Sequence, residues 1–256
     1  MQPNSPRLSL NPLLIALGLL ILLAVFIQSQ LNSIAVVPAT ASANVFSGQR
    51  AFNQLQHLTQ EQQPHPVDSA ANRIVEQRLV GLLQQMGYQP EVQQSHTCQD
   101  TTRGLARCAL VRNIIVHIEG QKVAAKQPNN GILLSAHYDS VPAGPGGSDA
   151  GAAVGTLLEI ARLLTLTDKP LNPIVLLFNE GEEFGLLGAK AFMQHPLAKT
   201  LQLAINVEAR GSAGKSVMFE TGEDSGWLVK SYQQTTPAPF SSSLFYEVYK
   251  FLPNDT

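Results

Sequence analysis

Residues 132–154 read ILLSAHYDSVPAGPGGSDAGAAV and join a short apolar run to a helix-like segment through a polar, glycine-rich loop. The run 132–136 suits a buried strand, because strands covered on both faces are rich in Val, Ile and Leu. The helix-like segment covers residues 152–166, and a second apolar run follows at 174–178. This alternation of strand, helix and strand predicts an α/β fold with a largely parallel sheet.

Further elements are expected on both sides of this stretch. Before it, apolar spacing predicts helices over 46–60 and 68–86 and a strand over 111–118. After it, the expected elements are a helix over 186–193, a strand over 203–207, a strand over 216–219 and a helix over 225–234. Together they predict a three-layer α/β sandwich with a mixed, largely parallel central sheet, preceded by one transmembrane helix.

Length and charge restrict the function classes. A chain of 256 residues has room for one sizeable α/β domain and an appendage. The 17 Lys and Arg residues and the 19 Asp and Glu residues give a net charge of −2, so the chain lacks the basic field that holds nucleic acid. Hydrophobic residues make up 44% of the sequence, which excludes intrinsic disorder. We therefore expect a folded domain without a nucleic-acid partner.

The N-terminal segment has the composition of a membrane anchor. No polar side chain occurs from Leu13 to Ile27, and no charged residue occurs between Arg7 and Arg50. With its uncharged flanks the helix is long enough for the roughly 30 Å of a bilayer core, so residues 12–31 are predicted to form a transmembrane anchor. Two alternatives stay open: a signal peptide cleaved near residues 39–43, and a buried core helix.

The charge next to this segment predicts its orientation. Arg7 is the only charged side chain before the anchor, so the positive-inside rule makes residues 1–11 a cytoplasmic tail. Residues 32–45 then form a linker to a domain over residues 46–256, which lies in the periplasm, the lumen or the exterior.

Cys98 and Cys108 enclose a polar stretch that could turn a hairpin, and such a pair would form a disulfide in an oxidising compartment. Two unpaired thiols are the alternative.

Polar residues follow the predicted strands, where catalytic groups of parallel sheets gather. His137 follows the run 132–136, and Asp139 could hold the second ring nitrogen of a metal-ligating imidazole. The alternative is a histidine satisfied at a loop edge. Asp149 opens the helix over 152–166, where it could ligate a metal or only cap the helix.

Three more carboxylates follow later strands. Glu182 and Glu183 come after the run 174–178, where one could bind a metal while the other takes a proton from water. The alternative is an acidic first turn of the next helix. Glu208 ends the strand over 203–207, and its alternative is a salt bridge to Arg210.

The order of these residues resembles the di-zinc aminopeptidase family, which includes secreted leucyl aminopeptidases, glutamate carboxypeptidases, glutaminyl cyclases and membrane-anchored endoplasmic reticulum metallopeptidases. Residues 136–154 (AHYDSVPAGPGGSDAGAAV) and 179–192 (NEGEEFGLLGAKAF) match its two most specific stretches. The helix at 64–86 is similar to the membrane-anchored branch, so the resemblance extends over most of residues 46–256. It implies a phosphorylase/hydrolase-like fold.

The resemblance also implies a reaction and a role for each residue. It implies two Zn2+ ions in the complete domain and removal of residues from peptide ends, with a peptide as the substrate. By this resemblance, His137 and Glu208 would hold one zinc, and Glu183 would hold a second. Asp149 would bridge both ions. Glu182 would be the general base, and Asp139 would orient His137. An aminopeptidase is the leading interpretation. Alternatives are a carboxypeptidase or glutaminyl cyclase on the same scaffold, and a binding module without catalysis.

The sequence departs from the family pattern at its end. The family has a late histidine for the second zinc, whereas residues 252–256 read LPNDT. We expect the peptidase domain to be incomplete at its C-terminus, so that this chain binds one zinc well and has little peptidase activity. No pattern in the sequence predicts side-chain preference or oligomeric state.

Overall fold

The computed structural model describes residues 10–31, 35–101, 104–121, 130–209, 211, 214, 216–222, 224–237 and 239–249. The described residues from 36 to 211 form one compact unit, which contains the sheet. The described residues of segments 10–35 and 214–249 group into the other unit.

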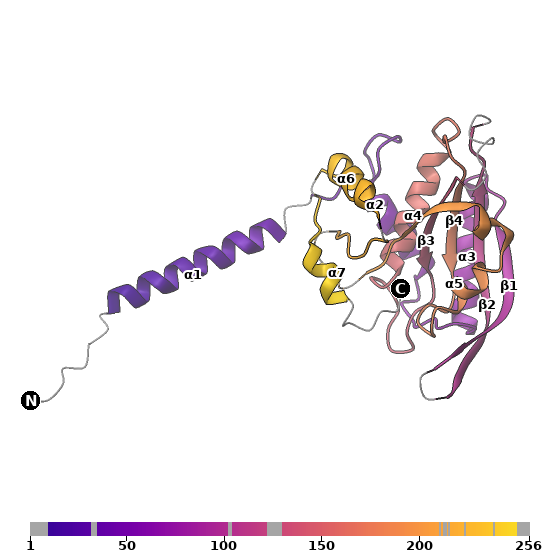
Figure 1. The fold of residues 1–256 in the computed structure, drawn as a ribbon, viewed down its shortest axis with the longest axis horizontal. Helices are drawn as coiled ribbons and strands as arrows, with labels where there is room; N and C mark the ends of the chain where they lie inside the picture. The colour runs from indigo at the N-terminus through magenta and orange to yellow at the C-terminus, as the bar shows by residue number, and fades with distance from the viewer. Residues whose placement is uncertain are drawn as a thin grey trace, which may run out of the picture. The chain divides into compact units, whose positions relative to one another are not determined.

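The first unit is built on a five-stranded sheet with the strand order β1-β2-β4-β3-β5 (Figure 1). The strands are β1 Glu91–Asp100, β2 Ala106–Ile118, β3 Gly131–His137, β4 Ile174–Asn179 and β5 Leu201–Asn206. Strand β3 runs parallel to β4 and β5, whereas β2 runs antiparallel to β1 and β4. The predicted mixed sheet is confirmed, and its parallel half carries the loops with the candidate site residues.

Helices cover both faces of the sheet and make three layers. Helices α2 (Gly48–Leu58), α3 (Ala70–Gln85) and α4 (Gly151–Leu164) share one core with the sheet, which includes Ile114, Phe178, Leu79 and Leu157. On the other face, α5 (Leu187–Phe192) and the 3-10 helix η2 (Pro196–Thr200) adjoin a second core, which includes Ile115, Leu177 and Phe192. Successive residues of β2 and β4 alternate between the two cores, as a strand buried on both faces requires.

Most predicted elements correspond to observed ones, with three differences among the strands and α-helices. The strand predicted over 216–219 is wrong, because Met218 makes only an isolated bridge to Ser241. Strand β1 was not predicted, since its sequence EVQQSHTCQD is polar and its residues are mostly exposed or half-buried. Helix α7 (Ser243–Tyr249) is short and was also not predicted, whereas α6 (Gly226–Thr235) matches its prediction. The two missed elements therefore have few buried side chains among those that the structure describes.

The N-terminal helix α1 spans Leu10–Leu31. Residues Pro12–Ser29 are long and apolar enough to cross a membrane, and none of them is buried within the protein. A core helix would bury an apolar face, so the core-helix alternative is not supported. Insertion into a bilayer stays a prediction.

Strands β1 and β2 pair as a hairpin, in agreement with the expectation that the polar stretch between Cys98 and Cys108 could turn. Cys98 and Cys108 face each other in its register and form a disulfide, with their Cα atoms 4.1 Å apart. The disulfide prediction is confirmed, and the bond ties together the two strands of the hairpin near its turn.

Helices α2 and α4 approach each other closely at Gly155. A Cβ atom added there would lie 2.6 Å from the carbonyl oxygen of Ala51 and 3.5 Å from Cβ of Leu55. Gly81 in α3 is a matched contrast, since a Cβ atom there would meet nothing within 4 Å.

We expect Gly155→Ala to lower the free energy of unfolding by about 1–3 kcal/mol, because the added methyl group forces the two helices apart. Gly81→Ala should instead raise it by about 0.5–1 kcal/mol through helix propensity. Denaturant unfolding of both variants tests this. Equal effects at the two positions would contradict the proposed close contact.

A buried carboxylate joins α2 to α4. Glu159 is 1% exposed and accepts hydrogen bonds from the backbone N–H of Ser47 and from the guanidinium groups of Arg50 and Arg162. The Arg50 guanidinium also donates to the carbonyl oxygens of Ala39 and Ala41. Part of the predicted linker segment is thereby attached to the domain.

We expect the contribution of Glu159 to depend on pH. Burial raises its pKa, but hydrogen bonds from Arg162, Ser47 and Arg50 outweigh burial and hold the pKa below its ordinary value of 4.5. Stability from this group is therefore complete above about pH 4.5 and is lost as the pH falls through the lowered pKa of the folded state. Glu159→Gln should lower the free energy of unfolding by about 2 kcal/mol at pH 7.

The measurement is denaturant unfolding of both proteins between pH 3 and pH 7. The difference between wild type and Glu159→Gln should shrink on acidification, because the wild-type carboxylate then becomes neutral as well. A difference that stays constant over this range would show that the charge of Glu159 does not stabilise the fold.

Candidate metal centre

The predicted site residues lie at one edge of the sheet. His137 ends β3, Glu182 and Glu183 follow β4, and Glu208 follows β5. Because these three strands are parallel, their carboxyl ends meet at the same edge. Asp149 reaches this edge from the loop that precedes α4.

His137 is at the centre of the group. Its side chain is 1% exposed, and its Nε2 atom lies 3.0 Å from Oδ1 of Asp149 and 3.4 Å from Oε1 of Glu208. Oε2 of Glu182 is 3.8 Å from the same nitrogen. One buried imidazole nitrogen thus faces three carboxylates, which the alternative of a histidine satisfied at a loop edge does not explain.

Asp139 contacts the opposite side of the imidazole. Nδ1 of His137 lies 3.0 Å from the main-chain carbonyl oxygen of Asp139 and 3.5 Å from its carboxylate oxygen Oδ1. That Oδ1 also accepts a hydrogen bond of 3.1 Å from the backbone N–H of Glu182. Asp139 therefore connects the histidine to the loop after β4, and the main-chain oxygen is its nearer contact with the ring.

Two of the alternative explanations are wrong. The N-cap position of α4 is Ala150, and no side chain caps this helix, so Asp149 is not a helix cap. Helix α5 begins at Leu187 and has no acidic residue in its first turn, so Glu182 and Glu183 are not part of a helix start. The third alternative, a salt bridge from Glu208 to Arg210, involves a residue that lies outside the described ones.

The loop that carries Glu182 and Glu183 is closed by a buried asparagine. Asn113 on β2 is fully buried, and its Oδ1 accepts a hydrogen bond from the backbone N–H of Glu180. Its Nδ2 donates to the carbonyl oxygen of Gly188, which fixes the other end of the loop. Sequence reasoning missed Asn113, although a polar residue inside the apolar run 111–118 was a visible signal.

Burial makes this concentration of negative charge costly. Burial, with the charges of the nearby carboxylates, raises the pKa of Glu182 to about 8 against the opposing effect of His137. Burial and the charge of Asp149 also raise the pKa of Glu183. Burial lowers the pKa of His137, but its hydrogen bonds with the surrounding carboxylates raise it far above the ordinary value. A bound cation would offset the repulsion among these groups.

Orphaned oxygen atoms test whether a metal fits the site. Oε2 of Glu208 and Oδ2 of Asp139 are buried without a hydrogen-bond partner, which is costly for a carboxylate in the interior. Carboxylate oxygens and imidazole nitrogen are also ligand types that suit Zn2+. The residues therefore fit a divalent cation.

Two groups of side chains could hold such an ion. His137, Asp149 and Glu208 form one, and His137, Glu182 and Glu183 form the other, with ligand atoms within 4.8 Å of one another in each. The first contains the residues predicted for one zinc. The second differs from the prediction, which paired Glu183 with Asp149. Both groups contain His137, and its Nδ1 faces Asp139, so Nε2 can serve one ion at a time.

Comparison with known proteins places the chain in a family. Residues 113–255, more than half of the sequence, match the pattern of Peptidase family M28. The chain belongs to peptidase family M28. Endoplasmic reticulum metallopeptidase 1 of Rattus norvegicus is 35% identical over 150 residues, which are 57% of this chain. The match covers 16% of the rat protein, so the M28 chain is similar to a small part of this curated relative.

Two solved structures share the fold of this chain. A glutaminyl cyclase from Porphyromonas gingivalis has a TM-score of 0.61 at 22% identity and covers 82% of this chain and 77% of its own. A Zn-dependent exopeptidase from Parabacteroides distasonis has a TM-score of 0.59 at 20% identity, with coverages of 84% and 80%. At these identities the likeness concerns the fold alone.

We expect the M28 chain to bind one Zn2+ tightly, because the two candidate groups share His137. Loss of a residue that only holds a metal ligand in place weakens metal binding by roughly 10–100-fold. His137→Ala removes a ligand itself, so it should weaken Zn2+ binding by more than this. His57→Ala, an exposed position on α2, should leave it unchanged.

Calorimetric titration with Zn2+ and metal analysis of the purified protein measure these affinities and the number of ions. Two tightly bound ions per chain, or wild-type affinity in His137→Ala, would contradict the assignment.

Proposed function

We propose that this M28 chain is a membrane-anchored, zinc-dependent aminopeptidase that removes N-terminal residues from peptides. The observation that carries the proposal is the convergence of His137, Asp149 and Glu208 within 4.8 Å, beside the buried carboxylate of Glu182. Membership of the M28 family supports peptide hydrolysis. The exopeptidase of similar fold, which is described as Zn-dependent, favours zinc as the ion.

Each side chain has a distinct task in this proposal. When bound, zinc supplies Lewis acidity that lowers the pKa of water and polarises the peptide carbonyl. Bound zinc would be held by His137, Glu208 and Asp149, and Asp149 and Glu183 would be available to a second ion. Asp139 orients the imidazole through the contacts at Nδ1.

Glu182 acts as the general base in the proposed reaction. Its Oε2 accepts a proton from the attacking water and later delivers it to the leaving amine, as one carboxylate can do in both steps. Only 8% of its side chain is exposed, and the backbone N–H of Glu182 is held by Asp139. The carboxylate is thus fixed beside the ligands, where a base must lie.

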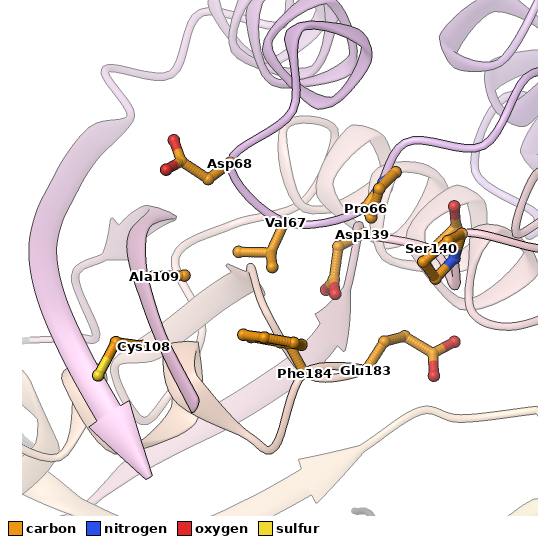
Figure 2. Close-up of a pocket in the computed structure, with 10 residues that line it drawn as sticks. Pro66, Val67, Asp68, Cys108, Ala109, Asp139, Ser140, Glu183 and Phe184 are labelled. Atoms are coloured by element: carbon orange, nitrogen blue, oxygen red, sulfur yellow. The ribbon is translucent and has the colours of Figure 1, made fainter. Parts of the chain in front are cut away.

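Charge near the centre favours the amino end of a peptide. The adjoining pocket is lined by the carboxylates of Asp68, Asp139 and Glu183 (Figure 2), and no Lys, Arg or His lies among its described lining residues. An α-ammonium group is attracted to such a surface, whereas a C-terminal carboxylate is repelled. This favours an aminopeptidase over a carboxypeptidase.

The proposal includes the predicted membrane topology. Residues 1–11 form a cytoplasmic tail, 12–31 the anchor, 32–45 the linker and 46–256 the peptidase domain. The length and composition of α1 support the anchor, and the Cys98–Cys108 disulfide favours an oxidising compartment for the domain. The name of the rat relative includes the endoplasmic reticulum.

We expect Glu182→Gln to reduce the turnover of aminoacyl-anilides by about 10²–10⁴-fold, while zinc binding is retained, because the amide cannot accept the proton. Steady-state kinetics and metal analysis on the same preparations test this. Glu61 is an exposed glutamate that is distant from Glu182 in the sequence. Glu61→Gln is therefore the matched control and should behave as wild type.

Three outcomes would overturn the proposal. Full activity of Glu182→Gln would reject the base. Cyclisation of N-terminal glutaminyl peptides without anilide hydrolysis would identify a glutaminyl cyclase. Absence of both zinc and turnover in the wild-type protein would identify a binding module without catalysis.

A further inference from the structure

The segment before α2 is attached to the first turn of that helix. Oγ of Ser47 donates a hydrogen bond of 2.9 Å to the carbonyl oxygen of Val37, and the backbone N–H of Gln49 donates to the same oxygen at 3.2 Å. The guanidinium group of Arg50 donates to main-chain oxygens further along the segment. Residues 36–46, here called the strap, are therefore part of the folded domain.

Little chain separates the strap from the apolar helix α1. This helix ends at Leu31, and the five residue steps from Leu31 to Val36 span at most about 18 Å when fully extended. The 22 residues of α1 correspond to about 33 Å of helix, close to the roughly 30 Å of a bilayer core. When α1 spans a membrane, the strap therefore begins within about 18 Å of the edge of that core.

The exposed side chains at and beside the strap are apolar. Val36 is 66% exposed and Phe52 on α2 is 51% exposed, and Val45 and Phe46 are exposed as well. A Cβ atom at Gly48 would lie 3.3 Å from Cγ1 of Val36, so Val36 packs over position 48. Positions 48 and 52 are four residues apart and share a helix face. Val36 and Phe52 therefore lie on the same face of α2.

The charge of this part of the chain suits a lipid surface. Residues 8–60 contain no Asp, Glu or Lys, and their one Arg is Arg50. Nε of Arg50 lies 2.9 Å from the buried carboxylate of Glu159, so its charge is offset within the protein. Anionic headgroups thus meet no carboxylate of this segment that they would repel, while its exposed apolar side chains gain by leaving water. Exposed apolar surface of this kind marks protein or membrane contacts.

The strap and the candidate metal centre lie toward opposite ends of α4. A Cβ atom at Gly151, where α4 begins, would lie 2.5 Å from Cδ1 of Leu55, whereas the backbone N–H of Ser47 donates to Glu159. Helix α2 therefore runs antiparallel to α4, and its first turn lies about 12 Å along α4 from the start of that helix. Asp149 precedes this start, so the strap is on the side away from the metal centre.

We propose that the strap and Phe52 form a lipid-docking surface, on which the domain rests against the bilayer with the candidate metal centre turned away from the membrane. The inference rests on the membrane anchor of the proposed function. Val36 and Phe52 enter the boundary between headgroups and acyl chains, at the depth of about 5–10 Å typical of interfacial apolar side chains. The domain then has one orientation on the membrane, and its site receives peptides from the aqueous side.

The test uses the full chain in vesicles of phosphatidylcholine and phosphatidylglycerol. Both cysteines of the chain are joined in the disulfide, so one introduced cysteine takes a fluorescent label. Gln56→Cys places the label at an exposed position one turn from Phe52 on the same face, and Gly18→Cys places it within α1. Lipids that carry a nitroxide near the headgroup or deep in the acyl chain quench a label by contact.

The shallow nitroxide should quench the label at position 56. Phe52→Asp and Val36→Asp should each abolish this quenching, because a carboxylate is costly to bury in the interface. Leu105→Asp is the matched control and should leave the quenching unchanged. Leu105 is 68% exposed in the turn between β1 and β2, and β2 begins beyond the carboxyl end of β4, on the side of the metal centre. Thermal unfolding in detergent checks that each variant is folded.

The outcomes separate the docking surface from the anchor. Quenching at position 18 by the deep nitroxide without quenching at position 56 would overturn the docking surface and leave the anchor in place. Quenching at position 56 that persists in both Phe52→Asp and Val36→Asp would also overturn it. So would a label at position 56 that is shielded from both the lipid nitroxides and aqueous iodide, because another protein surface then covers this face. Absence of quenching at position 18 would overturn the anchor and, with it, the docking.

Discussion

The candidate site depends on electrostatic repulsion among carboxylates that the fold forces together. Three of them approach a single nitrogen of the buried His137 within 3.8 Å, and Oε2 of Glu208 and Oδ2 of the neighbouring Asp139 are buried without partners. Such an arrangement costs free energy in a protein that binds nothing there. Many proteins accept this cost at functional sites, because a bound cation turns the repulsion into attraction. The arrangement is thus an argument for ion binding that stands apart from family membership.

The sheet and one polar side chain hold these groups in place. Parallel pairing of β3 with β4 and β5 brings three strand ends together, and Asn113 closes the loop that carries Glu182 and Glu183. Because Asn113 lies on the antiparallel strand β2, the antiparallel half of the sheet supports the site without contributing a ligand. A sheet that supplies both ligands and their supports keeps the site on rigid elements.

Sequence alone predicted the clustering of the candidate site residues better than the supports that hold them. Apolar runs and the acidic or imidazole residues that follow them are local signals, so β3, β4 and the positions of His137 and Asp149 were predictable. Strand β1 was not, because its polar sequence is stabilised by pairing with β2 and by a disulfide rather than by burial. The grouping of Glu183 with His137 was also out of reach, since it depends on loop closure by a distant residue. Distances between loops are tertiary facts that no periodicity encodes.

The β1–β2 hairpin has a consequence for how such enzymes diversify. It lines one end of the pocket beside the candidate metal centre through Cys108 and Ala109, yet none of its described residues belongs to the two candidate metal groups. Its length and sequence can change while the ion and the base remain intact. The pocket wall and the candidate ion ligands then lie on separate elements, so exchanging this hairpin between homologues would change the wall and leave the ligands in place.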